Sequence, residues 1–474
     1  MRWYLLAASV ILTTQCSQAA QSNPDQISPE MRREIAEVFS DYDRTDGPGC
    51  AVGVTQEGQL VYSRGFGIGT LDHGISLSDS SVFYLASVSK QFTAAAILLA
   101  DYEGLLDLDD PVRNHIPEFP DYGRVVTVRH LLHHTSGVRD YLTLMALAGI
   151  PNENVLTDQA MLGLITRQRE LNFNPGSEFL YSNSGYVLLA EIVKRATGQS
   201  LRDYAREKIF QPLGMNSTHF HDDRTEVVPG RVFSYDPRAD GSWRTNYLMN
   251  FDKVGDGGLY SSVQDLARWD RAFYEDLLGV PGFSERMYTR GILSNGDTIP
   301  YARGLGVSPR RGLPRVSHGG GLMAFRTMIA RYPEQKTSVI TLCNVGTANS
   351  GRLSVAVEDA VLRGVFPEPA EVSNRAAEPN ATGPGEITIP ESTVRGLAGS
   401  YRSSELSSTW VFEAQGSDLI LHHPNGDTTT LRSHGEMLFP SRDAQIQFVR
   451  EAEEVVAFVL DAGRVRNIRF DRVR

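Results

Sequence analysis

A serine and a lysine three residues apart, Ser87 and Lys90, open the apolar run "SVSKQFTAAAILLA". The chain has only five lysines among its 46 basic residues, and none of the other four follows a serine at this spacing. Residues i and i+3 share one face of a helix, so the amine can reach the hydroxyl. A lysine among apolar side chains has a lowered pKa and can accept a proton. The pair predicts a serine nucleophile beside its base; a lysine extending from a helix end is the structural alternative.

A tyrosine and an asparagine two residues apart, Tyr181 and Asn183, lie in "NPGSEFLYSNSGYVLLAEI". In an extended stretch, this spacing turns both side chains to the same side. A phenol can relay a proton between the serine and a leaving group, and an amide can bind a substrate carbonyl. The alternative is an ordinary turn with a buried tyrosine.

A histidine precedes three glycines in "RVSHGGGLMAF", within a strand-like context. Glycines weaken a strand, so they suggest that another backbone approaches closely, and a substrate peptide could lie there as an added strand. In that arrangement the N–H groups of Gly321 and Ser87 would form an oxyanion hole. The alternative is a glycine-rich turn with a surface histidine, His318.

Taken together and in this order, Ser-x-x-Lys, Tyr-x-Asn and His-x-Gly resemble the motifs of the class C β-lactamase-related serine hydrolases, within the serine β-lactamase and penicillin-binding protein superfamily. The resemblance runs through most of residues 48–365 and includes "PGCAVGVTQEGQLVYSRGFG", "VRHLLHHTSGVRDY" and "GGLYSSVQDLARW". It implies that Ser87 is the acylated nucleophile, Lys90 its activating partner and Tyr181 the proton shuttle. The substrate-facing and oxyanion positions that it implies are Asn183, His318, Gly320 and Gly321.

The third motif departs from the Lys-Thr-Gly that is frequent in this family. His-Gly-Gly resembles the variant of the esterase, DD-peptidase and D-aminopeptidase branches. A neutral histidine offers less positive charge than lysine to a β-lactam or a C-terminal carboxylate, which argues against efficient β-lactamase activity.

The elements around these motifs predict an α/β (α+β) fold of the β-lactamase/transpeptidase type. Strand-like runs near residue 50 and again from about 315 to 343 flank a mainly helical segment from 87 to about 275, and a helix follows. We therefore expect an antiparallel sheet closed from both chain ends, with a large helical insert, over residues 28–366. Residues 367–390 predict a linker. Residues 391–474 predict an all-β barrel of seven or eight strands, similar to the lipocalin-like domain of some of these hydrolases.

The first 20 residues have the pattern of a signal peptide. Arg2 precedes an apolar run from Trp3 to Leu12, and small residues follow at 17–20. The run is too short to span a bilayer, and no other segment looks transmembrane. We expect a periplasmic or secreted protein; Cys16 fits a lipoprotein anchor poorly.

The charge of the chain and the pattern of its histidines argue against a nucleic-acid-binding protein and against a metal site. The net charge of −11 argues against a nucleic-acid partner. We expect no metal and no cofactor: His130, His133 and His134 lack the glutamate of an H-E-x-x-H site, and His219 with His221 is interpreted as a loop or strand pair. Cys50 and Cys343 are expected to be two buried thiols, with a single disulfide as the alternative.

The sequence thus predicts an exported serine hydrolase that acts through an acyl-enzyme on amides or esters. D-amino-acid peptides or small esters are the expected substrates, and a β-lactam is the closest rival. A non-catalytic protein that binds cell-wall fragments or a partner is the alternative from another class. A further hypothesis is that the C-terminal barrel shapes the mouth of the site or mediates assembly. The pattern makes no prediction of the oligomeric state.

Overall fold

The structure is a computed structural model that describes residues 27–474, apart from 152–153, 247–249, 368–386, 388, 436 and 442–443. The predicted signal peptide, Cys16 and nearly all of the predicted linker lie outside the described residues.

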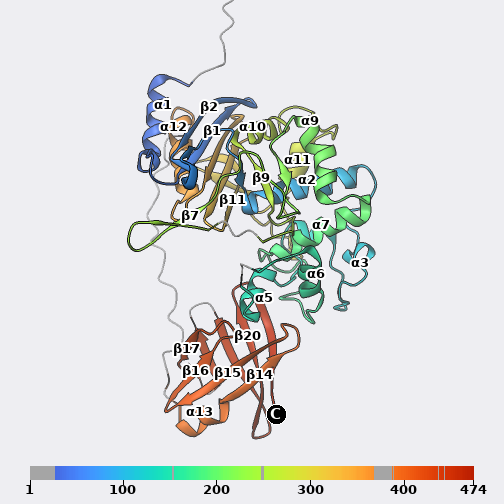
Figure 1. Cartoon of the computed structure of the whole chain (residues 1–474). Coiled ribbons are helices and arrows are strands. Elements are labelled where there is room, and N and C mark those ends of the chain that lie inside the picture. The colour runs from blue at the N-terminus through green and yellow to red at the C-terminus, as the bar shows by residue number, and fades with distance from the viewer. Residues whose placement is uncertain are drawn as a thin grey trace, which may run out of the picture.

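A six-stranded antiparallel sheet lies at the centre of the larger part of the molecule, with strand order β10-β11-β12-β13-β1-β2 (Figure 1). Its strands are β1 (Cys50–Gln56), β2 (Gln59–Phe66), β10 (Gly306–Arg310), β11 (Leu313–Leu322), β12 (Phe325–Tyr332) and β13 (Thr337–Cys343). Strand β1 pairs with β13 along its whole length. The prediction of a sheet closed from both ends of the chain is therefore confirmed.

Helices cover both faces of this sheet, which is why β1 and β13 are almost entirely buried. On one face, Val52 and Val54 of β1 pack in a cluster with α1 (Pro29–Val38) and α12 (Ser350–Val361). Gly53 points the other way, and a side chain there would lie 2.4 Å from Val263 of α10 (Val263–Arg271). Alternation along the strand thus places one helical layer on each side.

The prediction of two free thiols is wrong. Cys50 and Cys343 form a disulfide between the facing ends of β1 and β13, where the two residues are paired in register with Cα atoms 4.0 Å apart. The pattern of each strand indicated burial, but only the pairing of strands 293 residues apart in sequence brings the sulfurs together.

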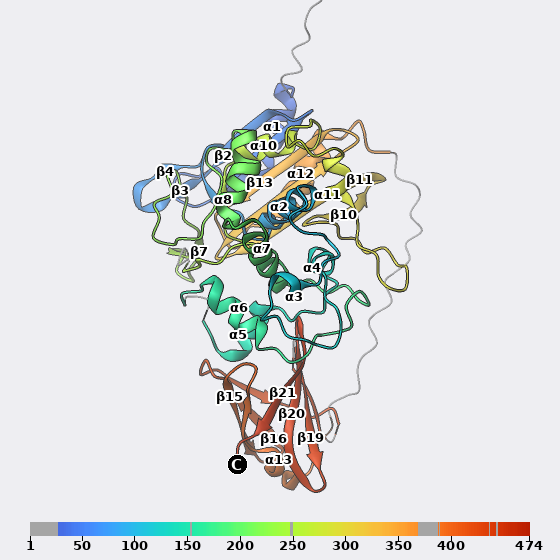
Figure 2. The same ribbon diagram turned by 90° about the vertical axis from the view of Figure 1, so that its right-hand side faces the viewer.

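The helical insert lies beside the sheet (Figure 2), and its central helix, α2 (Lys90–Tyr102), is buried along nearly its whole length. The other elements of the insert are α3 (Val112–His115), α4 (Val128–Leu132), α5 (Tyr141–Ala148), α6 (Asp158–Thr166), α7 (Asn183–Thr197), α8 (Leu201–Ala205), a π-helical turn (Arg206–Phe210) and α9 (Gln211–Leu213), with α11 (Phe283–Tyr288) further along. Helix α7 ends at a left-handed glycine, Gly198, which is a frequent C-terminal cap. Helix α4 ends at Leu132.

Among the described residues, short strands form three further small sheets in the larger part of the molecule. They are β5 (Phe83–Tyr84), β6 (His219–Phe220) and β9 (Leu259–Ser261), which form one sheet, and the pairs β3 (Ile68–Thr70) with β4 (Ile75–Ser76) and β7 (Tyr235–Pro237) with β8 (Trp243–Thr245).

The C-terminal part is a near-closed, barrel-like antiparallel sheet of eight strands, in the order β17-β16-β15-β14-β21-β20-β19-β18, which confirms the expected all-β fold. Its elements are α13 (Glu391–Leu397), β14 (Gly399–Ser403), β15 (Ser408–Gln415), β16 (Asp418–His422), β17 (Thr428–Leu431), β18 (Leu438–Ser441), β19 (Ala444–Glu451), β20 (Glu454–Ala462) and β21 (Val465–Arg472). Its core is aromatic, and Phe458 packs against Trp410, Phe412, Phe448 and Phe470. The lipocalin-like assignment and the domain boundaries stay predictions.

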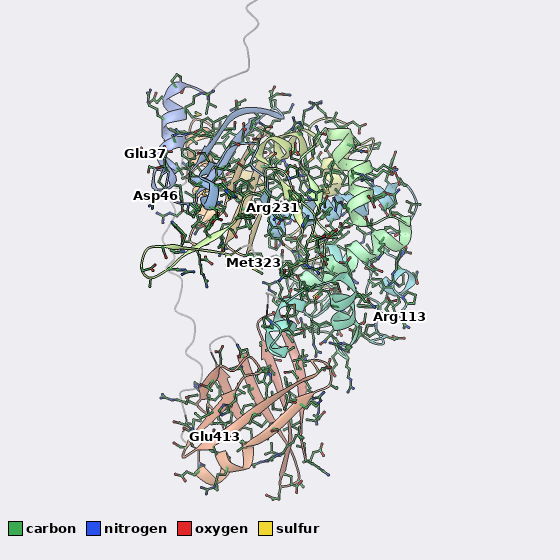
Figure 3. The ribbon with its side chains drawn as sticks, viewed as in Figure 1. Glu37, Asp46, Arg113, Arg231, Met323 and Glu413 are labelled. Atoms are coloured by element: carbon green, nitrogen blue, oxygen red, sulfur yellow. A yellow bond between two sulfur atoms is a disulfide. The ribbon has the colours of Figure 1, made fainter. Side chains whose placement is uncertain are left out.

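The two parts meet where the β20–β21 hairpin rises from the C-terminal sheet to the helical insert near α5, which both ribbon views show. Met323 lies in the turn between β11 and β12, at the end of the main sheet that is nearer to the C-terminal sheet (Figure 3). None of the helices in the described ranges combines the length and the hydropathy needed to cross a membrane.

Candidate active site

Ser87 lies in a single turn of 3₁₀ helix (Ala86–Ser89) that leads directly into α2. Its neighbours are buried, while Ser87 is partly exposed. The turn is held at both ends, because the Thr327 hydroxyl donates to the carbonyl oxygen of Leu85 at 2.8 Å and the Ser89 hydroxyl donates to that of Ala86 at 2.6 Å. Ala86 has a positive φ of 49°, which marks a sharp bend before the serine. The fold thus presents one hydroxyl from a rigid turn.

The amine of Lys90 is completely buried and donates to three oxygens. It lies 3.2 Å from the Ser87 hydroxyl, 2.8 Å from the side-chain oxygen of Asn183 and 2.7 Å from the backbone carbonyl oxygen of Asp256. Burial lowers the pKa of Lys90 to about 8, although the nearby carboxylates of Asp256 and Asp140 act in the opposite direction. The predicted Ser–Lys pair is therefore present, with an amine that can lose its proton near neutral pH.

A second buried lysine, Lys253, holds the loop that contains Asp256. The carboxylate of Asp256 accepts from Lys253 at 2.5 Å and from the Tyr141 hydroxyl at 3.0 Å. Burial opposes the charged carboxylate, but Lys253 and Lys90 outweigh it and lower the pKa of Asp256. The loop whose carbonyl oxygen binds Lys90 is thereby fixed by a charge pair.

Tyr181 lies next to the Ser–Lys pair, with its ring centroid 4.9 Å from the Lys90 amine. Within the part of the chain that the structure describes, its buried hydroxyl has no hydrogen-bond partner. Burial raises the pKa of Tyr181 well above its ordinary value, and the nearby Ser87 hydroxyl offsets this only in part. The phenol is therefore protonated at neutral pH. His134 packs on its ring at 4.2 Å between centroids and accepts from the Ser182 N–H at 3.1 Å, which holds the segment in place.

Asn183 is the first residue of α7, while Tyr181 and Ser182 are outside the helix, so only part of the stretch is extended. The buried carboxylate of Asp140 accepts from the backbone N–H of Asn183 at 2.7 Å and from its side-chain amide at 2.8 Å. These two bonds fix the amide with its oxygen toward Lys90. In this structure the Asn183 oxygen binds the lysine, and the amide thus orients the base.

His318 lies on β11 with its ring centroid 6.2 Å from that of Tyr181. Its Nδ1 is 2.7 Å from the carbonyl oxygen of Gly319, which can only accept, so Nδ1 carries the proton and Nε2 accepts from the Tyr301 hydroxyl at 3.0 Å. Burial, with the charge of Lys90, lowers the pKa of His318 to about 4. The imidazole is neutral and engaged on both sides.

Gly320 is required by a close approach of backbone. A Cβ atom there would lie 2.3 Å from the carbonyl oxygen of Leu85 and 3.0 Å from the backbone nitrogen of Ser87. The approaching backbone is thus the serine turn of the chain itself. At Gly321 the nearest atom to a Cβ belongs to the Arg326 side chain, at 3.7 Å. Strand β10 pairs with β11 only over residues 313–317, so it does not occupy that edge of β11 beside Ser87.

The family comparison agrees with this geometry. The family model described as "Beta-lactamase" matches residues 35–362, more than half of the chain. The chain belongs to the β-lactamase family. Within this family it is similar to penicillin-binding protein 4* of Bacillus subtilis (strain 168), with 34% identity over 337 residues that cover 68% of this chain and 73% of the relative. This β-lactamase family member is a hydrolase.

Two further comparisons bear on its architecture. A D-aminopeptidase of Gluconobacter oxydans (strain 621H) is 30% identical over 304 residues, 64% of this chain, and the chain spans only 56% of that relative's length. The solved octameric penicillin-binding protein homologue from Pyrococcus abyssi aligns with a TM-score of 0.61 and 24% identity, over 93% of this chain and 99% of that one. At this identity the likeness shows the fold alone; its coverage extends into the C-terminal sheet.

The structure brings together six of the seven predicted site residues, with Gly321 following Gly320 on β11, and it adds supports that the motifs do not contain. Asp140, Asp256 and Tyr301 contact the predicted residues directly. Asp140 had a detectable signal, since it precedes an apolar helix as an N-cap in "GVRDY". Nothing in the local sequence marks Asp256 or Tyr301 as part of the site.

A cluster outside this site contains His219 and His221, whose ring nitrogens are 3.3 Å apart, and Glu226. The strand-pair interpretation is right for β6, since His219 pairs with Tyr260. The Arg202 guanidinium donates to the Glu226 carboxylate at 2.7 Å, so the negative charge of this cluster is already paired with a positive side chain of the protein.

Proposed function

We propose that this chain hydrolyses amide or ester bonds through an acyl-enzyme on Ser87, with Lys90 as general base. The observation that carries the proposal is the buried Lys90 amine, 3.2 Å from the serine hydroxyl, with a pKa of about 8. A base must lie within hydrogen-bond reach of the proton that it takes and must be unprotonated at the working pH. Lys90 lies within reach of the serine proton, and its pKa of about 8 keeps about one tenth of the amine neutral at pH 7 and about one half at pH 8.

Tyr181 acts in this scheme as a neutral proton relay. Its raised pKa makes the phenol a poor primary base, whereas its hydroxyl lacks a partner among the described residues and lies beside Ser87. The serine proton passes to Lys90 as Oγ attacks the substrate carbonyl. Tyr181 gives its phenol proton to the leaving nitrogen or oxygen and takes a proton back from the Lys90 ammonium, so that both groups end in their starting, neutral form. In deacylation, Lys90 takes a proton from the attacking water, the bond between the carbonyl carbon and Oγ breaks, and Oγ receives the proton from Lys90, so that the carboxylic acid is released and the serine hydroxyl is restored.

The developing oxyanion is assigned to two backbone N–H groups, those of Ser87 and Gly321. Support comes from the packing of Gly320 against the serine turn, which holds β11 against Ser87. Loss of such a donor typically reduces the rate about 10²–10³-fold. The edge of β11 that β10 leaves unpaired is suited to bind a substrate backbone as an added strand.

D-amino-acid peptides, amides and small esters are the proposed substrates. The names of the similar proteins, a D-aminopeptidase and a penicillin-binding protein, support this class. A β-lactam is the second candidate, but the neutral His318 provides no cation on β11 for its carboxylate. The test is hydrolysis of D-alanine p-nitroanilide, its L-enantiomer and nitrocefin by wild type and Ser87→Ala. We expect turnover of the D-substrate that Ser87→Ala abolishes; faster nitrocefin turnover would reverse the order of substrates, and equal rates in both proteins would refute the nucleophile.

We also propose that the protein is exported. The N-terminal pattern supports this, and so does the Cys50–Cys343 disulfide, since disulfides persist in oxidising compartments. Cell fractionation with N-terminal sequencing of the product tests it: a processed periplasmic or secreted chain is expected, and an uncleaved cytoplasmic one would contradict the proposal.

A further inference from the structure

The β20–β21 hairpin carries one charged side chain into the candidate active site. Its turn consists of Gly463 and Arg464, between the paired residues Ala462 and Val465. Gly463 has a positive φ of 54°, as the first central residue of a two-residue hairpin turn requires. The tip of this hairpin lies against the helical insert near α5 in both ribbon views (Figures 1 and 2).

The guanidinium of Arg464 lies beside the residues that surround Ser87. Its carbon is 5.2 Å from the Tyr181 ring centroid, and the Lys90 amine is 4.9 Å from the same point. The two cations are therefore at most about 10 Å apart. The Ser87 hydroxyl is 3.2 Å from the Lys90 amine, so it lies at most about 13 Å from the Arg464 guanidinium. An extended peptide advances about 3.3–3.6 Å per residue, so a substrate bound at Ser87 can reach Arg464 within about four residues.

Contacts with the insert fix the hairpin tip. The Arg464 carbonyl oxygen accepts from the Asn172 side chain at 2.9 Å, and the Arg466 N–H donates back to that side chain at 2.8 Å. Arg139, which is fully buried, donates to the Arg466 carbonyl oxygen at 3.0 Å and pairs with Glu405 at 2.7 Å. The C-terminal sheet thus holds Arg464 in a defined position, which lowers the entropic cost of binding to it.

The Arg464 side chain retains binding capacity. Within the described ranges its one ion pair is with Asp140, through a single nitrogen at 3.3 Å. Asp140 binds Asn183 more closely, at 2.7 and 2.8 Å. A guanidinium has five N–H donors and can bind a carboxylate through two of them. The side chain is 41% exposed, so a ligand can approach it.

We propose that Arg464 forms an anion subsite, and that the enzyme prefers substrates with a carboxylate within about four residues of the scissile bond. This inference rests on the proposed function. Lys90 is occupied by three acceptors and His318 by two partners, so neither is free to bind the anion. In this proposal the C-terminal sheet supplies a cation that the His-Gly-Gly motif lacks, and so acts as a specificity element.

Two matched substrate pairs test the proposal and locate the carboxylate. N-acetyl-D-alanyl-D-alanine and its C-terminal amide differ in charge on the leaving side. N-succinyl-D-alanine p-nitroanilide and its N-acetyl analogue differ in charge on the acyl side. Values of kcat/KM are compared for wild type, Arg464→Gln, Arg464→Lys and the control Arg469→Gln, which removes an exposed charge from strand β21 of the same hairpin. Because Arg464 lowers the pKa of Lys90, all rates are measured at pH 9.5, where the lysine is mostly neutral in every variant.

We expect wild type to prefer the anionic member of at least one pair by about tenfold or more, as loss of a charged hydrogen bond implies. Arg464→Gln should remove this preference, measured as the ratio of kcat/KM for the anionic and neutral member of each pair, while Arg464→Lys keeps part of it and Arg469→Gln keeps all of it. Equal rates for both members of both pairs in wild type would overturn the inference but leave the proposed function intact. So would an equal loss on all four substrates in Arg464→Gln, which would indicate a structural anchor. No turnover of any substrate by wild type would overturn both.

Discussion

The pKa of Lys90 gives the sharpest prediction for the chemistry. Its amine must be neutral to accept the serine proton, and burial lowers its pKa to about 8. The neutral fraction is then about one half at pH 8, about one tenth at pH 7 and about one hundredth at pH 6. We therefore expect kcat/KM to rise about tenfold per pH unit up to pH 7.5 and to level off above pH 9.

The assay is hydrolysis of N-acetyl-D-alanine p-nitroanilide, which has no group that titrates in this range, from pH 5.5 to 10 at constant ionic strength. Ionisation of His318 does not change the pH profile in this range, because its pKa of about 4 leaves the imidazole neutral from pH 5.5 to 10. Lys90→Arg is the matched variant: arginine keeps the charge but cannot lose its proton, so we expect a loss of about 10²–10⁴-fold at every pH. A flat profile between pH 6 and 9, or an active Lys90→Arg protein, would refute Lys90 as the base.

The remaining predictions concern the supports of the site. Replacing both Cys50 and Cys343 by alanine should cost about 2–5 kcal/mol of unfolding free energy, measured by urea denaturation; an unchanged midpoint would mean that the disulfide does not stabilise the fold. Gly320→Ala places a methyl group 2.3 Å from a backbone carbonyl oxygen and should lower kcat/KM about a hundredfold, whereas Gly163→Ala, with no atom within 4 Å, should not. Equal effects of the two glycine substitutions would contradict the packing argument. Asp140→Asn removes an anion that raises the pKa of the active-site lysine, so the acid limb of the pH profile should move to lower pH; a shift to higher pH would reverse the sign of that interaction.

Short-range patterns were enough to predict which side chains lie together at the candidate site. Ser87 and Lys90 share a turn, and Tyr181 and Asn183 are two residues apart, so local spacing carries that information. The glycines beside His318 correctly indicated close backbone contact, although the contact is with the serine turn. The sheet closed from both chain ends also followed from the order of strand-like and helix-like segments.

What the sequence could not predict depends on contacts between distant segments. Cys50 and Cys343 become neighbours only through the register of β1 with β13. Arg464 has no motif around it, and its relevance arises because a hairpin of the C-terminal sheet packs on the insert more than 280 residues earlier in the chain. Side chains of this kind can be recognised only once the fold has assembled.

Covalent capture of the nucleophile tests the central claim most directly. The protein is incubated with a fluorophosphonate probe, digested, and mapped by mass spectrometry alongside Ser87→Ala and the Lys90→Arg variant. We predict one modified peptide in wild type, with the added mass on Ser87, much slower labelling of Lys90→Arg, and none of Ser87→Ala. Labelling of another residue at the same rate in wild type and Ser87→Ala would contradict the assignment.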